Sequence, residues 1–218
     1  MTAPKIKICG LTTPDALDAA IRARADYAGL VFFPPSPRNL GLSEAADLAA
    51  RAEGRIARVG LFVDADDATL AEAVAAARLD VLQLHGEESP QRAAEVRARF
   101  GLPVWKALPV AARADVLRAD AYAGAADLIL FDAKTPKGAA LPGGMGLSFD
   151  WNLVAHWKGP LAWGLAGGLT PDNVAEAIRL TGAALADTSS GVESAPGVKD
   201  VDKIAAFCKA ARNTSGQS

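Results

Sequence analysis

The feature that most constrains the fold of this chain is a repeated pair of segments, a short apolar run followed by a longer alanine-rich stretch with helical spacing. Several of the apolar runs are nearly continuous rather than alternating, which is typical of parallel strands buried on both faces. The expected strands are KIKIC (5–9), YAGLVF (27–32), ARVGLFV (57–63), DVLQLH (80–85), PVWKAL (103–108), DLILFD (127–132), LAWGLAG (161–167) and AALAD (183–187).

The stretches between these runs have helical spacing and good helix starts. Helices are expected over 14–25, 43–54, 66–79, 89–101, around 111–121, and over 170–182 and 201–212. Their predicted starts are Thr13-Pro14-Asp15, Ser43 with Glu44, Ser89-Pro90 and Thr170-Pro171-Asp172. The glycine- and proline-containing segment 133–150 favours a loop instead of a helix between the sixth and seventh strands.

Eight strands that alternate with helices match a compact, parallel eight-stranded (β/α)₈ TIM barrel of the α/β class. An open doubly wound sheet is the structural alternative, because alternation alone does not show closure. No linker divides the chain, so residues 1–212 are predicted to form a single (β/α)₈ barrel domain. Residues 213–218 read as a disordered tail.

Composition and charge restrict the class of function. The chain has 218 residues, half of them hydrophobic, and a formal net charge of −2, which offers no electrostatic footprint for nucleic acid or a membrane surface. Its two cysteines make neither a disulfide framework nor a CxxC pair. Its first residues lack the apolar core of a signal peptide, and no apolar run reaches the ~18–20 residues that span a bilayer. We therefore expect a reduced, cytoplasmic protein.

Polar and ionisable residues gather where the predicted strands end, which is where parallel barrels place their chemistry. These residues are Cys9, Pro34–Arg38, Asp64, Gln83, His85, Lys106, Asp132, Gly167–Gly168 and Asp187–Glu193. The pattern favours an enzyme, although periodicity alone names none.

Two of these segments together suggest a phosphate site. AGGLTPDN (166–173) is a glycine pair before a helix start, and ADTSSGVES (186–194) is a hydroxyl-rich turn after the last strand. Phosphates bind to backbone N–H groups at helix N-termini, and in (β/α)₈ enzymes frequently at the loops after strands seven and eight. Ordinary turns and caps use the same residue types, so they remain the alternative.

Six motifs in order resemble the phosphoribosylanthranilate isomerase family. They are KICGLTTPDA (7–16), FFPPSPR (32–38), QLHGEE (83–88), LFDAK…GGMGLSFDW (130–151), AGGLTPDN (166–173) and DTSSGVE (187–193). The resemblance implies a (β/α)₈ barrel and an Amadori rearrangement in tryptophan biosynthesis. The substrate would be N-(5-phosphoribosyl)anthranilate and the product 1-(2-carboxyphenylamino)-1-deoxyribulose 5-phosphate. No cofactor or metal is implied, and the expected partner is this small phosphosugar, bound by a monomer or homodimer.

The implied reaction needs an acid that protonates the furanose oxygen and a base that removes a proton from the neighbouring carbon. Cys9 matches the family's general base, and a nearby helix N-terminus or cation would favour its thiolate; a buried, inert cysteine is the alternative. Asp132 matches the family's general acid, and desolvation at the end of an apolar strand would favour the protonated carboxyl group that an acid needs. An aspartate that caps a helix or loop is the alternative. Cys208 lies in a helical pattern and reads as a packing residue.

The resemblance also implies residues that bind the substrate. Arg38 matches the residue that holds the anthranilate carboxylate, a task suited to its planar fork, although a solvated loop arginine is the alternative. Gly167, Gly168, Ser189 and Ser190 would hold the phosphate. Asp187 would face the ribose hydroxyls or stabilise its own turn. The motifs depart from the family at Met145, where threonine is more typical, and at Thr188, where valine is usual.

Other polar and aromatic residues have two readings each. Gln83 and His85 share one strand face and point towards the substrate, although a hydrogen-bonded structural histidine is at least as plausible. No partner at zinc-ligand spacing accompanies His85. Lys106 is either a phosphate or carboxylate neighbour or a rim charge. Core packing is the default for the four tryptophans, Trp105, Trp151, Trp157 and Trp163, although each is able to flank an aromatic ring.

Other functions make different demands on the same positions. The pattern of the related histidine-pathway isomerase is a pair of aspartates, one at strand one and one at strand six. This chain has Cys9 at the first of these positions. Indole-glycerol-phosphate synthase carries a lysine-based acid and base and a longer N-terminal extension. A non-catalytic phosphosugar-binding protein would be expected to lose Cys9 or Asp132. A purely structural interaction protein would not need ionisable groups at so many strand ends.

Overall fold

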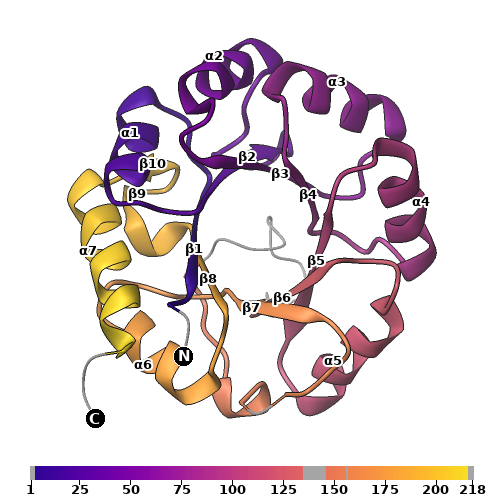
Figure 1. Ribbon diagram of the computed structural model, residues 1–218, viewed down its shortest axis with the longest axis vertical. Coiled ribbons are helices and arrows are strands. Elements are labelled where there is room, and N and C mark those ends of the chain that lie inside the picture. Colours follow the sequence, from indigo (N-terminus) through magenta and orange to yellow (C-terminus); the bar gives the residue numbers. More distant parts are fainter. Residues whose placement is uncertain (1–2, 135–145, 156, 216–218) are drawn as a thin grey trace.

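The chain folds into a closed barrel of eight parallel strands surrounded by helices, as the computed structural model shows (Figure 1). The structure describes residues 3–134, 146–155 and 157–215. The strands are β1 (Lys5–Cys9), β2 (Tyr27–Phe32), β3 (Ala57–Phe62), β4 (Val81–Leu84), β5 (Val104–Val110), β6 (Leu128–Ala133), β7 (Ala162–Leu165) and β8 (Leu185–Thr188). Because β8 pairs with β1, the sheet has no edge, and the open doubly wound alternative is wrong.

The helices form a ring outside the strands (Figure 1). They are α1 (Pro14–Arg22), α2 (Leu42–Ala52), α3 (Asp67–Ala77), α4 (Pro90–Phe100), α5 (Arg113–Leu117), α6 (Val174–Thr181) and α7 (Val201–Arg212), with 3₁₀ turns η1 (Arg118–Tyr122), η2 (Trp151–Leu153), η3 (Ser190–Val192) and η4 (Asn213–Ser215). As expected, the described part of the connection between β6 and β7 contains η2 rather than an α-helix. None of the described helices is long and apolar enough to span a bilayer.

Helix starts were predicted correctly where a side chain caps the helix. The Thr13 hydroxyl accepts a hydrogen bond from the Ala16 N–H at 3.3 Å, and the Ser89 hydroxyl accepts one from the Arg92 N–H at 3.2 Å. The other two starts were wrong. Helix α2 begins at Leu42, which places Ser43 inside its first turn. Helix α6 begins only at Val174, because a turn from Thr170 to Asn173 precedes it, closed by the Thr170 N–H to the Asn173 side chain at 2.8 Å.

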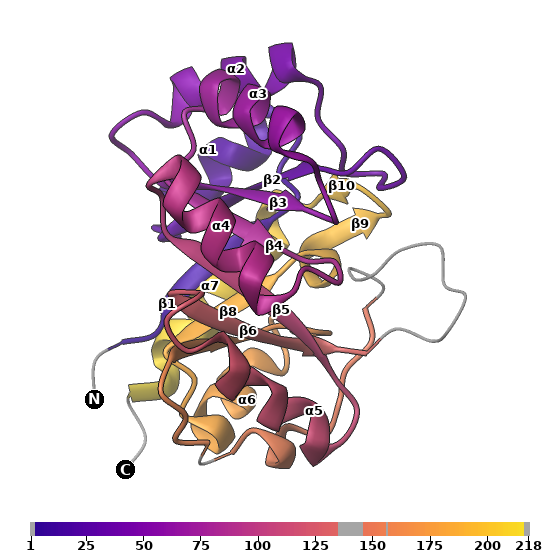
Figure 2. The same ribbon diagram turned by 90° about the vertical axis from the view of Figure 1, so that its right-hand side faces the viewer.

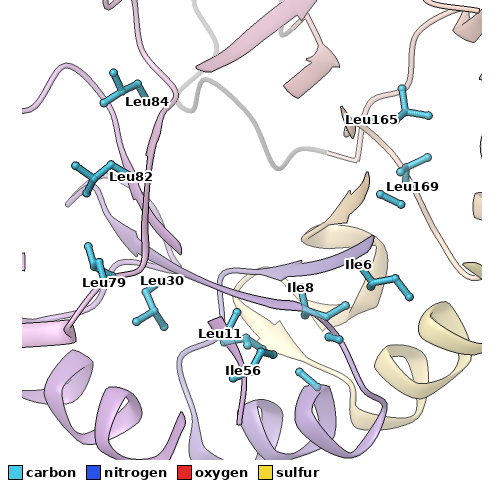
Figure 3. Close-up of a cluster of buried hydrophobic side chains, with 14 of the residues drawn as sticks. Ile6, Ile8, Leu11, Leu30, Ile56, Leu79, Leu82, Leu84, Leu165 and Leu169 are labelled. Carbon is cyan, nitrogen blue, oxygen red and sulfur yellow. The ribbon is translucent and has the colours of Figure 1, made fainter. Parts of the chain in front are cut away.

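Alternation along the strands divides the apolar side chains between two cores. Consecutive residues of β4 illustrate this, because Val81 packs in one cluster and Leu82 in the other. The larger cluster, which includes Ile6, Ile8 and Leu82, fills the space between the strands and the helices (Figure 3). The smaller cluster fills the inside of the barrel and consists of Val59, Val81, Trp105, Ala107, Leu130 and Leu185. The side chains of Lys7 and Cys9 belong to the inner face, since Ile6 and Ile8 face the helices.

A short hairpin follows the last barrel strand. Its strands are β9 (Glu193–Ala195) and β10 (Val198–Lys199), which pair antiparallel. In Figure 2 the hairpin lies at the end of the barrel away from the start of β1. It therefore belongs to the end where the parallel strands finish. Residues 213–215 of the predicted tail form η4, and 216–218 lie outside the described residues, so disorder of the tail stays a prediction.

Candidate active site

A pocket opens at the carboxyl ends of the barrel strands, and its empty space, together with the open solvent at its mouth, is about 790 Å³. Its lining includes most of the predicted site residues, namely Cys9, Arg38, His85, Asp132, Gly167, Gly168, Asp187, Ser189 and Ser190. Gln83 is completely buried and contacts the ring of His85. Met145 lies outside the described residues. Closure of the barrel thus brings together side chains that are up to 181 positions apart in the sequence.

The Cys9 thiol is at the end of β1 and is almost completely buried, with 4% of the residue exposed. Space for the sulfur comes from Gly29 on the neighbouring strand β2, where a Cβ atom would lie 2.9 Å from Sγ. Burial raises the pKa of the Cys9 thiol, and the nearby charge of Asp187 adds to this effect, while the Lys7 and Lys199 ammonium groups oppose it. The net result is a pKa above the ordinary value.

Asp132 comes from β6, and the apolar strand Leu128–Phe131 delivers it to the pocket with 8% of its surface exposed. One carboxylate oxygen accepts a hydrogen bond from the following Ala133 N–H at 2.8 Å. The other lies 3.2 Å from Nε2 of His85. Gly167, whose φ of 81° favours glycine, lies against this group, because a Cβ there would be 2.9 Å from the Asp132 carboxylate.

His85 follows β4, and its ring contacts Gln83 on the same strand. Nε2 of Gln83 lies 3.1 Å from Nδ1 of the ring. An amide NH₂ is a donor, so Nδ1 of a neutral ring accepts and Nε2–H is directed at Asp132. His85 therefore contacts the Asp132 carboxyl group directly, and Gln83 acts on that group indirectly, through its contact with the His85 ring. This arrangement is available only because the two side chains share one strand face.

Arg38 pairs with Glu193, a residue to which the sequence analysis gave no role. Arg38 Nε and Nη2 donate to the two Glu193 carboxylate oxygens at 2.7 and 2.8 Å, and Lys199 Nζ donates to the same carboxylate at 2.6 Å. All three side chains are buried, so the alternative of a solvated loop arginine is wrong. The pairing uses the Nε edge of the guanidinium group, and the arginine also lines the pocket.

Asp187 and the hydroxyl-rich loop complete the pocket wall. The Asp187 carboxylate accepts hydrogen bonds from Lys7 Nζ at 3.1 Å on each oxygen. Ser189 donates its hydroxyl to the Cys9 carbonyl at 3.1 Å, and Lys199 Nζ donates to the Ser189 carbonyl at 2.9 Å. The short helix η3 starts directly after Ser189, so its first N–H groups, which lack acceptors within the helix, belong to the pocket wall.

Lys106 is not a rim charge, because only 1% of it is exposed. Its ammonium group donates to the Glu88 carboxylate at 2.9 Å and to the Gly86 carbonyl at 2.7 Å. Its neighbours on β5, Trp105 and Ala107, face the inside of the barrel, so Lys106 faces the helices. Its contacts hold the loop that follows His85.

Lys7 and Lys199 were not predicted as members of the site, and Glu193 was placed among the strand-end residues without a role. A signal for Lys7 exists in the strand KIKIC, where the lysine shares the inner face with Cys9 and a buried cation needs a partner. Glu193 is the last residue of the DTSSGVE motif, whereas for Lys199 the only signal was proximity to that motif. Among the described residues, no group of three or more His, Cys, Asp and Glu side chains is placed to hold a metal ion.

Replacing Glu193 by glutamine is expected to lower the free energy of unfolding by about 3 kcal/mol near neutral pH, because two buried cations lose their counter-charge. The Arg38 and Lys199 charges outweigh burial and lower the pKa of Glu193 below its ordinary value. The ion pair therefore stabilises the fold above that ordinary value, and this contribution is lost as the pH falls through the lowered pKa.

Urea unfolding at neutral and acidic pH measures this difference. The matched control is Glu53→Gln, which removes an exposed ion pair with Arg78 and should cost at most about 1 kcal/mol. Equal losses in the two variants, or a loss from Glu193→Gln that does not shrink in acid, would contradict the expectation.

Comparisons with known proteins agree on one family. Residues 6–210 match the family model of N-(5'phosphoribosyl)anthranilate (PRA) isomerase. A protein of this name from Paramagnetospirillum magneticum is 59% identical over 208 residues, which cover 95% of this chain and 97% of that protein. A relative from Rhodospirillum rubrum is 55% identical over 216 residues, covering 97% of this chain and 99% of that protein.

Solved structures agree with the sequence relatives. The phosphoribosyl anthranilate isomerase of Thermotoga maritima is similar with a TM-score of 0.85 and 33% identity, covering 98% of this chain and 100% of that one. Another isomerase structure, solved with reduced 1-(o-carboxyphenylamino)-1-deoxyribulose 5-phosphate, has a TM-score of 0.81 at 31% identity, covering 98% of this chain and 100% of that one. On this evidence the chain belongs to the phosphoribosylanthranilate isomerase family.

Proposed function

We propose that this chain catalyses the Amadori rearrangement of N-(5'-phosphoribosyl)anthranilate to 1-(2-carboxyphenylamino)-1-deoxyribulose 5-phosphate in tryptophan biosynthesis. The observation that carries the proposal is that a thiol and a carboxyl group, Cys9 and Asp132, line one pocket in a barrel of this family. A family member crystallised with the reduced product adds support for a phosphosugar ligand of this class.

The first step is ring opening with Asp132 as the acid. The protonated carboxyl group donates its proton to the furanose oxygen while the bond from that oxygen to C1′ breaks. The nitrogen lone pair of the anthranilate forms a C=N double bond, which leaves an iminium ion. The His85 ring next to Asp132 orients the carboxyl group and is placed to exchange a proton with it.

The second step is removal of the C2′ proton by the Cys9 thiolate. The electron pair of the C–H bond forms a C1′=C2′ double bond, and the iminium nitrogen becomes neutral. The resulting enol then tautomerises to the ketone, with one proton lost from the C2′ hydroxyl and one gained at C1′. Atoms and charge balance, so the net reaction is an isomerisation.

The remaining residues bind the two ends of the substrate. Gly167, Gly168, Ser189 and Ser190 are proposed to hold the phosphate at the loops after β7 and β8, where (β/α)₈ enzymes frequently bind phosphate. Arg38 lines the pocket and is proposed to bind the anthranilate carboxylate with its guanidinium group. Asp187 is proposed to accept hydrogen bonds from the ribose hydroxyls.

The direct test is turnover by the purified protein. We expect loss of phosphoribosylanthranilate, made in situ, to be accelerated without added metal and in the presence of a chelator. Absence of turnover, together with retained binding of the reduced product, would contradict the proposal and would favour a related phosphosugar or a binding function. Residues 1–212 as one domain, a monomeric or homodimeric state and a cytoplasmic location stay predictions.

A further inference from the structure

A fully buried lysine lies inside the barrel next to the candidate base. Lys7 has no exposed surface, and its strand neighbour across the β1–β8 pairing is Asp187. Its ammonium group donates to both oxygens of that carboxylate at 3.1 Å. Lys7 and Cys9 are two positions apart on one strand, so their side chains share the inner face of the barrel.

The same ammonium group interacts with the Cys9 thiol. Its positive charge lowers the pKa of the Cys9 thiol, which opposes the larger, raising effect of burial. The lysine is therefore hydrogen-bonded to a carboxylate and acts electrostatically on a thiol. Burial lowers the pKa of Lys7, but the charges of Asp187 and Cys9 outweigh that effect and hold it above the ordinary value, so the amine stays protonated.

Charged and titratable groups approach this corner of the pocket from several elements. Lys7 comes from β1, Asp187 from β8, Asp132 from β6 and Lys199 from β10, and His85 and Arg38 follow β4 and β2. Arg38 and Lys199 both donate to Glu193. Lys7 is the cation that lies on the same strand as Cys9, two positions away, where both buried side chains share the inner face of the barrel.

We propose that Lys7 is a positioning residue that supplies the counter-charge for the Cys9 thiolate. The Asp187 carboxylate, which pairs with the same ammonium group, partly offsets the stabilising effect of that charge on the sulfur. A thiolate at a buried position is costly without such a cation. Lys7 remains protonated throughout, and the proton taken from the substrate resides on sulfur. This inference rests on the proposed role of Cys9 as the base.

The test measures thiol ionisation directly, by the pH dependence of Cys9 alkylation with iodoacetamide, followed by mass spectrometry. The parent is Cys208→Ala, because the second thiol is buried in α7 and burial raises its pKa to about 11. In Lys7→Met we expect the midpoint to rise by about one pH unit, which is about a tenfold loss of thiolate near neutrality. In Asp187→Asn we expect the midpoint to fall, because a negative charge near the sulfur is removed.

A matched control is Lys106→Met. Lys106 is also a buried strand lysine with a buried carboxylate partner, Glu88, but it faces the helices instead of the pocket. Its midpoint should equal that of the parent. If Lys7→Met does not fold, the alkylation midpoint is measured in Lys7→Arg and Asp187→Asn instead. Lys7→Arg keeps the charge, so its midpoint should lie near that of the parent, whereas the midpoint of Asp187→Asn should fall. An unmoved midpoint in Lys7→Met or Asp187→Asn, or an equal rise in Lys106→Met, would overturn the proposal.

Rate profiles separate this proposal from the proposed function. In Lys7→Met, kcat should recover as the pH is raised, with KM little changed, whereas Cys9→Ala should not recover. A shifted alkylation midpoint in a protein without isomerase activity would support the Lys7–Cys9 coupling and contradict the proposed function. An unshifted midpoint in an active isomerase would contradict the coupling alone.

Discussion

Replacing Cys9 by alanine is expected to reduce kcat by about 10²–10⁴-fold, the range typical of losing a general base. Alanine keeps the strand and the packing against Gly29 but has no group that accepts the C2′ proton. Binding of the reduced product should change little, because the phosphate, carboxylate and hydroxyl contacts are proposed to lie on other residues. Steady-state kinetics and a binding titration with that product measure the two quantities.

The control for this variant is Cys208→Ala, which removes the other buried cysteine from α7. It should leave kcat unchanged. The pH profile adds a second check. Since the pKa of Cys9 lies above its ordinary value, kcat/KM of the native enzyme should rise with pH through neutrality as the thiolate forms, and this rise should vanish in Cys9→Ala. Near-native turnover by Cys9→Ala would return this residue to a packing role.

Replacing Asp132 by asparagine is expected to reduce kcat by about 10²–10⁴-fold as well, because an amide does not donate the proton that opens the ring. The carboxylate accepts the Ala133 N–H on one oxygen and faces His85 Nε2 with the other. Asparagine keeps the size of the side chain but leaves only one oxygen for these two contacts. A modest loss of stability should therefore accompany the loss of turnover.

Binding of the reduced product and the unfolding transition separate the two effects. We expect the variant to remain folded and to bind that ligand nearly as well as the native chain. The double variant Cys9→Ala with Asp132→Asn should lose much less than the product of the single losses, since both groups act in one reaction. If Asp132→Asn turns over at a near-native rate, the acid must be another group of the pocket.

Individual residues show why some site members were predictable and others were not. Cys9 and Asp132 stand at the ends of apolar runs, so a local pattern and a family motif were enough to single them out. The roles of Arg38 and Lys106 were less accessible, because each depends on a buried carboxylate elsewhere in the chain. Arg38 meets Glu193 155 positions away, and Lys106 meets Glu88 18 positions away.

The two misplaced helix starts have a local cause. Ser43 and Thr170 have the side chains that cap helices, but capping depends on which residue first adopts helical backbone angles. At α2 the helix begins before Ser43, and at α6 the Asn173 side chain binds the Thr170 N–H and delays the helix to Val174. Such competition among neighbouring polar side chains is not visible in residue type alone.

The sequence by itself determined the order and approximate bounds of the strands and helices, because hydrophobic periodicity and helix caps are local properties. It also determined the candidate acid and base. Only the tertiary structure decided that the sheet closes and which charges meet inside it. Lys7 joins Asp187 across 180 positions because β8 pairs with β1, and the energy of a buried charge depends on the partner that closure brings to it.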